Sequence, residues 1–284
     1  MATAVTKLRS VGAAVILAIL VGQGSPACSP SAPAPRVAEV ALDIPRMDAG
    51  NGPTSAAGRV VFAHPSARVG ARWRVTLHAE SVSDDASGHQ LTTYDSESLV
   101  EVLAVDGPAA TRFRVRFDRN VNAYQSAESP TPIHGKTYVV DVSAPHVRDE
   151  RGAAATPDET ERVENLFPDL GTRARVDEAL PDEPAKIGDR RDDLARAILR
   201  VLHPRLWSAD AATAVLGRVE GADAVFLVTL DASSTSGTKM HRAGEATVRT
   251  SDAVMSHVVL AGDYEPGAGN AHGVFKVERR VAPE

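Results

Sequence analysis

The clearest pattern in the chain is at residues 112–117, where three arginines alternate with three apolar residues. A period of two places successive side chains on opposite faces of a strand, so this segment predicts a half-buried antiparallel strand. We expect Arg112, Arg114 and Arg116 to form a solvated outer face and to pair with carboxylates of neighbouring strands, such as Glu97 and Glu101.

Similar alternation occurs on both sides of this segment, separated by turn-forming residues. Short turns favour neighbouring antiparallel strands, so the segments predict a meander with one face on the core. The further strands are expected at 73–82, 99–105 and 138–142, with turns at 84–88 and 106–108.

Two helices are predicted between this meander and a second one. Thr156, Pro157 and Glu159 form a capping box with proline at the first helical position, which opens a helix that runs to Phe167 and ends at Pro168. Residues 192–202 carry apolar side chains at helical spacing, so this helix should pack on a sheet.

Strands resume in the last third of the chain. They are predicted at 212–218, 224–231, 245–250, 254–261 and 273–279. The fold class is therefore α+β, with an antiparallel β half at 59–150, a helical connection at 151–211, and a second β half at 212–284 that packs with the first. The segments 67–73 (ARVGARW) and 185–191 (AKIGDRR) are alike, which raises the possibility of an internal duplication.

Some predicted strands are apolar on nearly both faces. Residues 99–105 and 224–230 are the clearest cases. Either helices cover the second face, or the sheet encloses an apolar pocket. In the second case the chain would resemble the half-barrel carriers of the lipoprotein-transport type, whose lumen holds acyl chains.

The N-terminus has the pattern of an export signal. Lys7 and Arg9 precede an uncharged apolar segment at 11–21, which spans roughly half of the approximately 20 residues needed for a transmembrane helix. We expect residues 1–27 to be a removable signal peptide. Residues 28–58, rich in Pro, Ala, Ser and Gly, are expected to start with a lipidated cysteine and to form a flexible tether.

Cys28, the only cysteine, follows Ser25, Pro26 and Ala27. The segment resembles the lipobox of bacterial lipoproteins, which implies a lipid anchor on Cys28 and an extracytoplasmic protein held at a bacterial membrane. With Ser29 after the cysteine, the resemblance implies the outer membrane, facing the periplasm or the cell surface, where the host has one. The alternative is a freely secreted or periplasmic protein with an idle thiol.

Residues 180–189 (LPDEPAKIGD) resemble the V-x-V-G-D-x-W type opening found in uncharacterised secreted bacterial lipoproteins with two β-rich halves. The segments 244–246 and 262–264 are also similar to that family. The resemblance covers most of residues 60–280 and implies an architecture but no reaction.

The charge balance limits the partners. The net charge is −6, and removal of the signal would bring it to −8 because Lys7 and Arg9 leave with it. An acidic chain offers no field for a polyanion, so nucleic acid is not expected. We expect contact with the membrane through the lipid on Cys28, and either an apolar ligand or an envelope protein as a further partner.

No motif of a nucleophile elbow, phosphate loop or zinc helix is present in the sequence. His241, His257 and His272 could form a metal or hydrolytic site only if their strands brought them together beside a carboxylate. The loop 231–237 fits a polar hairpin better than a calcium site. The carboxylates of Asp189, Asp192 and Asp193 fit helix capping and local ion pairs.

The sequence therefore predicts no catalytic residue, metal or cofactor, and it favours a non-catalytic function without deciding the question. The leading hypothesis is a membrane-tethered binding or envelope-structure module. The alternatives are a lipid or lipoprotein carrier with an apolar lumen, and an envelope-directed hydrolase.

Overall fold

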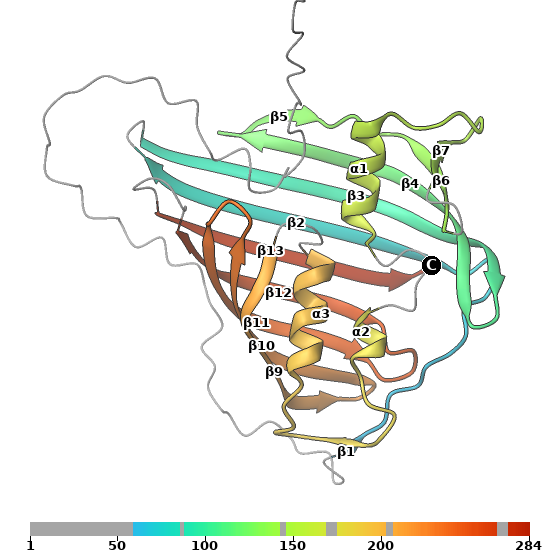
Figure 1. Ribbon diagram of the computed structural model, residues 1–284, viewed down its shortest axis with the longest axis vertical. Helices are drawn as coiled ribbons and strands as arrows, with labels where there is room; N and C mark the ends of the chain where they lie inside the picture. The colour runs from blue at the N-terminus through green and yellow to red at the C-terminus, as the bar shows by residue number, and fades with distance from the viewer. Residues whose placement is uncertain (1–58, 86–87, 143–145, 169–174, 203–206, 266–271) are drawn as a thin grey trace, which may run out of the picture.

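Ten strands from both halves form one continuous antiparallel sheet. A further short strand, β5 (Ala127–Pro130), pairs with β4. The computed structural model describes residues 59–85, 88–142, 146–168, 175–202, 207–265 and 272–284 (Figure 1). The first meander comprises β2 (Arg72–Asp85), β3 (Gly88–Asp106), β4 (Ala109–Tyr124), β6 (Thr137–Asp141) and β7 (His146–Asp149). The second comprises β9 (Trp207–Glu220), β10 (Asp223–Ser234), β11 (Lys239–Arg249), β12 (Met255–Glu265) and β13 (His272–Pro283).

The two meanders are joined edge to edge. The last strand, β13, pairs with β2 along its whole length, for example Val277 with Ala79, so the sheet runs unbroken from β7 to β9. The antiparallel meanders and the intervening helices are thus confirmed, although the protein is mainly β and its helices are few. The predicted signal, Cys28 and tether lie outside the described residues.

Three helices cover one face of this sheet, which we call the inner face (Figure 1). They are α1 (Pro157–Leu166), α2 (Arg175–Glu178) and α3 (Asp192–Leu202). Leu194 and Ile198 of α3 are fully buried, as the helical spacing of apolar residues predicts. Among the described residues no helix has the length and apolar character needed to cross a bilayer.

The buried apolar residues of the inner face form two clusters. The C-terminal cluster packs α3 on the second meander and includes Leu194, Ile198, Phe226 and Leu260. The N-terminal cluster packs α1 on the first meander and includes Val115, Phe117, Tyr138 and Val163. One sheet therefore supports two separate helix-on-sheet cores.

A single carboxylate caps α1 and fixes it to the sheet. Glu159 accepts a hydrogen bond from the Thr156 amide at 2.8 Å, completing the predicted capping box. Its other oxygen accepts from Lys136 Nζ at 2.6 Å and from the Tyr138 hydroxyl at 2.9 Å. Burial opposes ionisation, but these hydrogen bonds, with that from Lys136 the strongest, outweigh it and lower the pKa of Glu159 to about 2.

The outer face carries the alternating charges. Arg114 and Arg72 both reach Glu101, and Arg112 pairs with Asp141 at 2.7 Å. The expectation that the arginine row is a solvated face paired with carboxylates is confirmed, although Glu97 pairs with Arg74 instead of with the row.

Two short β-elements lie outside the large sheet. β1 (Arg59–Val60) pairs with β8 (Ala185–Lys186). The residues after β8 continue along β9, where the Gly188 amide donates to Leu216 and the Arg191 amide donates to Ala214. This segment covers the free edge of β9, which would otherwise expose unpaired backbone groups.

The two similar sequence segments adopt the same turn. The turns comprise residues 68–71 and 186–189. In each turn the amide of the fourth residue donates a hydrogen bond to the carbonyl of the first, Ala71 to Arg68 at 3.1 Å and Asp189 to Lys186 at 2.9 Å. The third residue is a glycine with positive φ, +82° at Gly70 and +92° at Gly188, as a type II turn requires. Each glycine amide then donates to a strand of the sheet.

Candidate functional site

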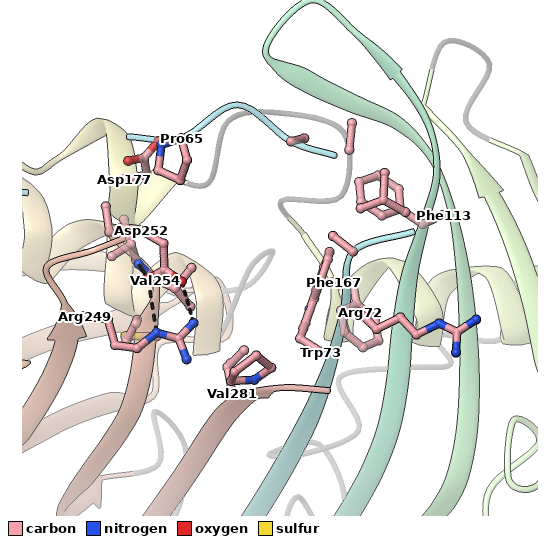
Figure 2. A pocket seen from close by; sticks show the side chains of 18 of the residues that line it. Pro65, Arg72, Trp73, Phe113, Phe167, Asp177, Arg249, Asp252, Val254 and Val281 are labelled. Carbon is pink, nitrogen blue, oxygen red and sulfur yellow. Dashed lines mark hydrogen bonds and ion pairs between the residues drawn. The ribbon is translucent and has the colours of Figure 1, made fainter. Parts of the chain in front are cut away.

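A cavity of about 460 Å³ lies on the inner face, between the two core clusters, at the end of the sheet where β13 finishes (Figure 2). Its walls come from distant parts of the chain: β2, β3, β4 and β13, the turn between β11 and β12, and the ends of α1, α2 and α3. The residues 61–71 that connect β1 to β2, which we call the strap, contribute Pro65, Ala67 and Arg68.

Apolar side chains line most of the cavity. Strand alternation turns Trp73, Val102 and Phe113 toward the inner face, and Val281 enters from β13. Trp73 and Phe113 meet edge to face, with ring centroids 6.4 Å apart and planes at 80°. Figure 2 shows these rings and Phe167 on one side of the space. Figure 2 shows Val254 on the opposite side, and Val176, Val201 and Met255 of the C-terminal cluster complete the apolar lining.

The strap passes from one core cluster to the other. Its Ala63 amide donates to Thr250 of the second half, while the amides of Ala67 and Gly70 donate to Pro108 and Val102 of the first half. The strap is hydrogen-bonded to both halves of the sheet and also lines the cavity. It therefore forms one wall of the cavity. His64 contacts Asp177 of α2, and both side chains are largely buried.

Charged residues lie at the edge of the apolar lining. Arg249 and Asp252 form a bidentate pair, Nη2 to Oδ2 at 2.7 Å and Nε to Oδ1 at 3.1 Å, next to Val254 (Figure 2). Arg68, Arg72 and Arg279 also line the cavity. The guanidinium of Arg72 points away in Figure 2, consistent with its pairing with Glu101 on the outer face.

The histidines singled out from the sequence are not gathered at this cavity. His241 pairs with Asp231 at 2.5 Å, and His257 pairs with Glu278 at 3.1 Å, both on the outer face. His257 lies opposite Thr247 of β11, six residues from His241, a separation of about 20 Å at the rise of a strand. His272 begins β13, and its side chain lies outside the described part of the structure. Within the described residues no group of His, Cys, Asp or Glu is arranged to hold a metal ion.

The other polar candidates have local roles. Asp192 pairs with Arg190 at 2.6 Å, Asp193 with Arg196 at 3.0 Å, and the Lys186 amide donates to Asp189. In the loop 231–237 the Ser234 amide donates to Thr238 across a hairpin. The local ion-pair and hairpin interpretations therefore fit the geometry of these segments.

The sequence signal for the cavity was indirect. Doubly apolar strands predicted either covering helices or a pocket, and the structure contains both: helices over each cluster and a space between them. Residues of the strap and of the 249–254 turn carried no pattern that pointed to a shared site, because they meet only through pairing of the first and last strands of the sheet.

Comparison with known proteins adds no function. No family model matches the chain, and no curated protein matches it. One similar solved structure is described as "De novo design of transmembrane beta-barrels"; it is 6% identical, and the match covers 76% of this chain and 99% of that one. Its TM-score of 0.17 is too low for any argument about this protein.

Proposed function

We propose that this protein is a carrier or receptor for an apolar ligand, held outside the cytoplasm at a bacterial membrane by a lipid on Cys28. The cavity between the two core clusters carries the proposal. Each cluster is a complete helix-on-sheet core, so the space between them is not required to complete the packing of either.

The size and lining of the cavity fit a ligand site. The volume of about 460 Å³ falls in the range of roughly 300–1,000 Å³ typical of small-molecule sites. The aromatic rings of Trp73, Phe113 and Phe167, together with aliphatic side chains, would contact an alkyl chain and remove much of its surface from water.

The geometry favours binding over hydrolysis. An envelope-directed hydrolase would need His241, His257 or His272 in a cleft beside a carboxylate, whereas His241 and His257 form ion pairs on the outer face. The cavity places Asp177 and Asp252 at its edge, each already in contact with a basic side chain. A role as an envelope-structure module would not use the cavity.

We also infer that the two halves arose by duplication of one unit. The support is the shared type II turn at 68–71 and 186–189, each presenting an exposed β-branched residue, Val69 and Ile187, beside its glycine. In a duplicated carrier, the cavity lies where the two units meet.

Native mass spectrometry tests the proposed function. The described elements lie between Arg59 and Pro283, so the chain from Ser29 to Glu284 keeps them all and lacks only the signal and Cys28. We expect this chain, exported and purified without detergent, to carry an apolar adduct of constant mass that organic extraction removes.

A pair of matched variants distinguishes the cavity from other surfaces. Ala110→Trp fills the cavity from β4, whereas Ala261→Trp adds the same ring to the outer face of β12. The adduct should be lost in the first variant and kept in the second. A wild-type chain that is always free of adduct, or an adduct unaffected by Ala110→Trp in a folded protein, would refute the proposed function.

A further inference from the structure

The charges around the cavity are unlike those of the whole chain. Apart from Arg72, whose guanidinium points away to Glu101, three arginines and two aspartates line it, a surplus of one positive charge, although the chain as a whole has a net charge of −6. Because the surplus is local and lies beside an apolar space, it creates a positive field where the head of an amphiphile would lie.

Arg249 is placed to meet a ligand. Its side chain is only 22% exposed and extends beside the cavity, level with Val281 in Figure 2. Asp252 binds its Nε and Nη2 atoms and so holds the guanidinium plane in a fixed orientation. A guanidinium has five N–H donors in a rigid fork, so donors remain for a second oxyanion.

Arg68 supplies a second cation from the strap. It is exposed, and no carboxylate in the described part of the chain forms an ion pair with it. The two aspartates at the cavity are in contact with His64 and Arg249. The strap and the 249–254 turn thus bring two arginines from opposite ends of the sequence to one cavity.

We propose that the ligand is a single-chain anionic amphiphile, with its alkyl chain against Trp73, Phe113 and Val281 and its carboxylate or phosphate head bound by Arg249 and Arg68. This inference rests on the proposed function and specifies the ligand class. A group the size of a water molecule occupies about 30 Å³. The cavity of about 460 Å³ therefore has room for on the order of fifteen such groups, which suits one alkyl chain.

The test compares amphiphiles that share one alkyl chain and differ in the head. Dodecanoate, dodecyl phosphate and the neutral dodecanol are titrated below their aggregation limits into the chain from Ser29 that carries Trp207→Phe, with Trp73 fluorescence and calorimetry as readouts. The anionic compounds should bind at least about tenfold more tightly than dodecanol, because charge-assisted hydrogen bonds to arginine add to the apolar contact. Comparing dodecanoate with dodecyl phosphate tells which oxyanion the site prefers.

Arginine variants assign the head site. Arg249→Gln and Arg68→Gln should each weaken binding of the preferred anion by about tenfold and leave dodecanol binding unchanged. Arg119→Gln, which removes a charge paired with Glu128 away from the cavity, is the matched control and should change neither. Arg68 is exposed, so its variant remains informative if Arg249→Gln fails to fold.

The outcomes separate the two proposals. If dodecanol binds as tightly as dodecanoate and dodecyl phosphate, or if Arg68→Gln and a folded Arg249→Gln leave anion binding unchanged, the assignment of an anionic ligand is wrong while the apolar site stands. If none of the three compounds binds and the purified chain carries no adduct, the proposed function itself fails.

Discussion

His64 and Asp177 are 113 residues apart in the sequence, yet the Nδ1 atom of one contacts a carboxylate oxygen of the other at the edge of the cavity. The side chains are 14% and 16% exposed, so water screens the contact little. His64 belongs to the strap and Asp177 to α2, and the contact therefore ties the segment above the cavity to the helical side of the molecule.

Asp177→Asn should loosen the strap. The substitution keeps the shape of the side chain but removes the charge facing His64, and a hydrogen bond to a charged group contributes about 1.5–3 kcal/mol. We expect hydrogen exchange of the Ala67 and Gly70 amides to become about tenfold faster, because both are bonded across the strap.

The neighbouring Asp182 provides the control. It lies 3.5 Å from His64 Nε2, but its side chain is 94% exposed, so Asp182→Asn should leave strap exchange close to that of the wild type. Equal exchange in the wild type and Asp177→Asn would show that the contact does not hold the strap.

The secondary structure could be predicted well because its signals are local. The alternation at 112–117, the capping box at 156–159 and the helical spacing at 192–202 each depend on neighbours within a few residues, and each became the expected element, in β4, α1 and α3. The short elements β5 and β7 were missed because four residues are too few to show a period.

The site could not be predicted in the same way. Trp73 and Val281 face one cavity only because β13 returns to pair with β2, a contact between the ends of the folded chain. Arg242 shows a second limit: the alternation of β11 turns this arginine inward, where it is fully buried and its guanidinium lies 4.0 Å from the centre of the Phe275 ring. Composition and motifs would have placed it on the surface.

Glu159 should make stability dependent on pH in the acidic range. Its pKa is lowered from 4.5 to about 2 in the folded protein, so its contribution is complete above about pH 5 and is lost as the pH falls toward 2. The shift corresponds to about 3 kcal/mol at most. Urea unfolding should therefore show Glu159→Gln less stable than the wild type at pH 7, with a difference that shrinks as the pH falls toward 3.

A half-buried glutamate of the same helix offers the matched variant. Glu161→Gln changes the same helix without touching Lys136 or Tyr138, and it should alter stability by no more than about 0.5 kcal/mol at either pH. A constant difference between the wild type and Glu159→Gln at all pH values would mean that the carboxylate is not ionised preferentially in the folded state.

Gly262→Ala should destabilise the centre of the sheet. An added Cβ would overlap the carbonyl oxygen of His241 on the neighbouring strand, and backbone atoms cannot turn aside as a side chain can. We expect a loss of about 1–3 kcal/mol or more in the free energy of unfolding.

Gly217→Ala is the comparison. Its Cβ would meet the flexible side chain of Leu227 at 3.1 Å, so this variant should have a smaller effect. Equal stability of the two variants would show that β11 and β12 can separate to accept the methyl group.

Cys28 should carry the lipid of the proposed membrane anchor. Each buried methylene of an acyl chain contributes about 0.8 kcal/mol, so a multiply acylated cysteine holds a protein to a bilayer without a spanning segment. In a bacterial host fed an alkyne-labelled fatty acid, the full chain should incorporate label and sediment with membranes. Cys28→Ser should lose the label, whereas Ser29→Ala, which changes the adjacent residue and leaves the thiol, should keep it. An unlabelled wild-type chain cleaved after Ala27 and recovered in soluble form would refute the anchor, and the cavity would then serve a freely diffusing binding protein.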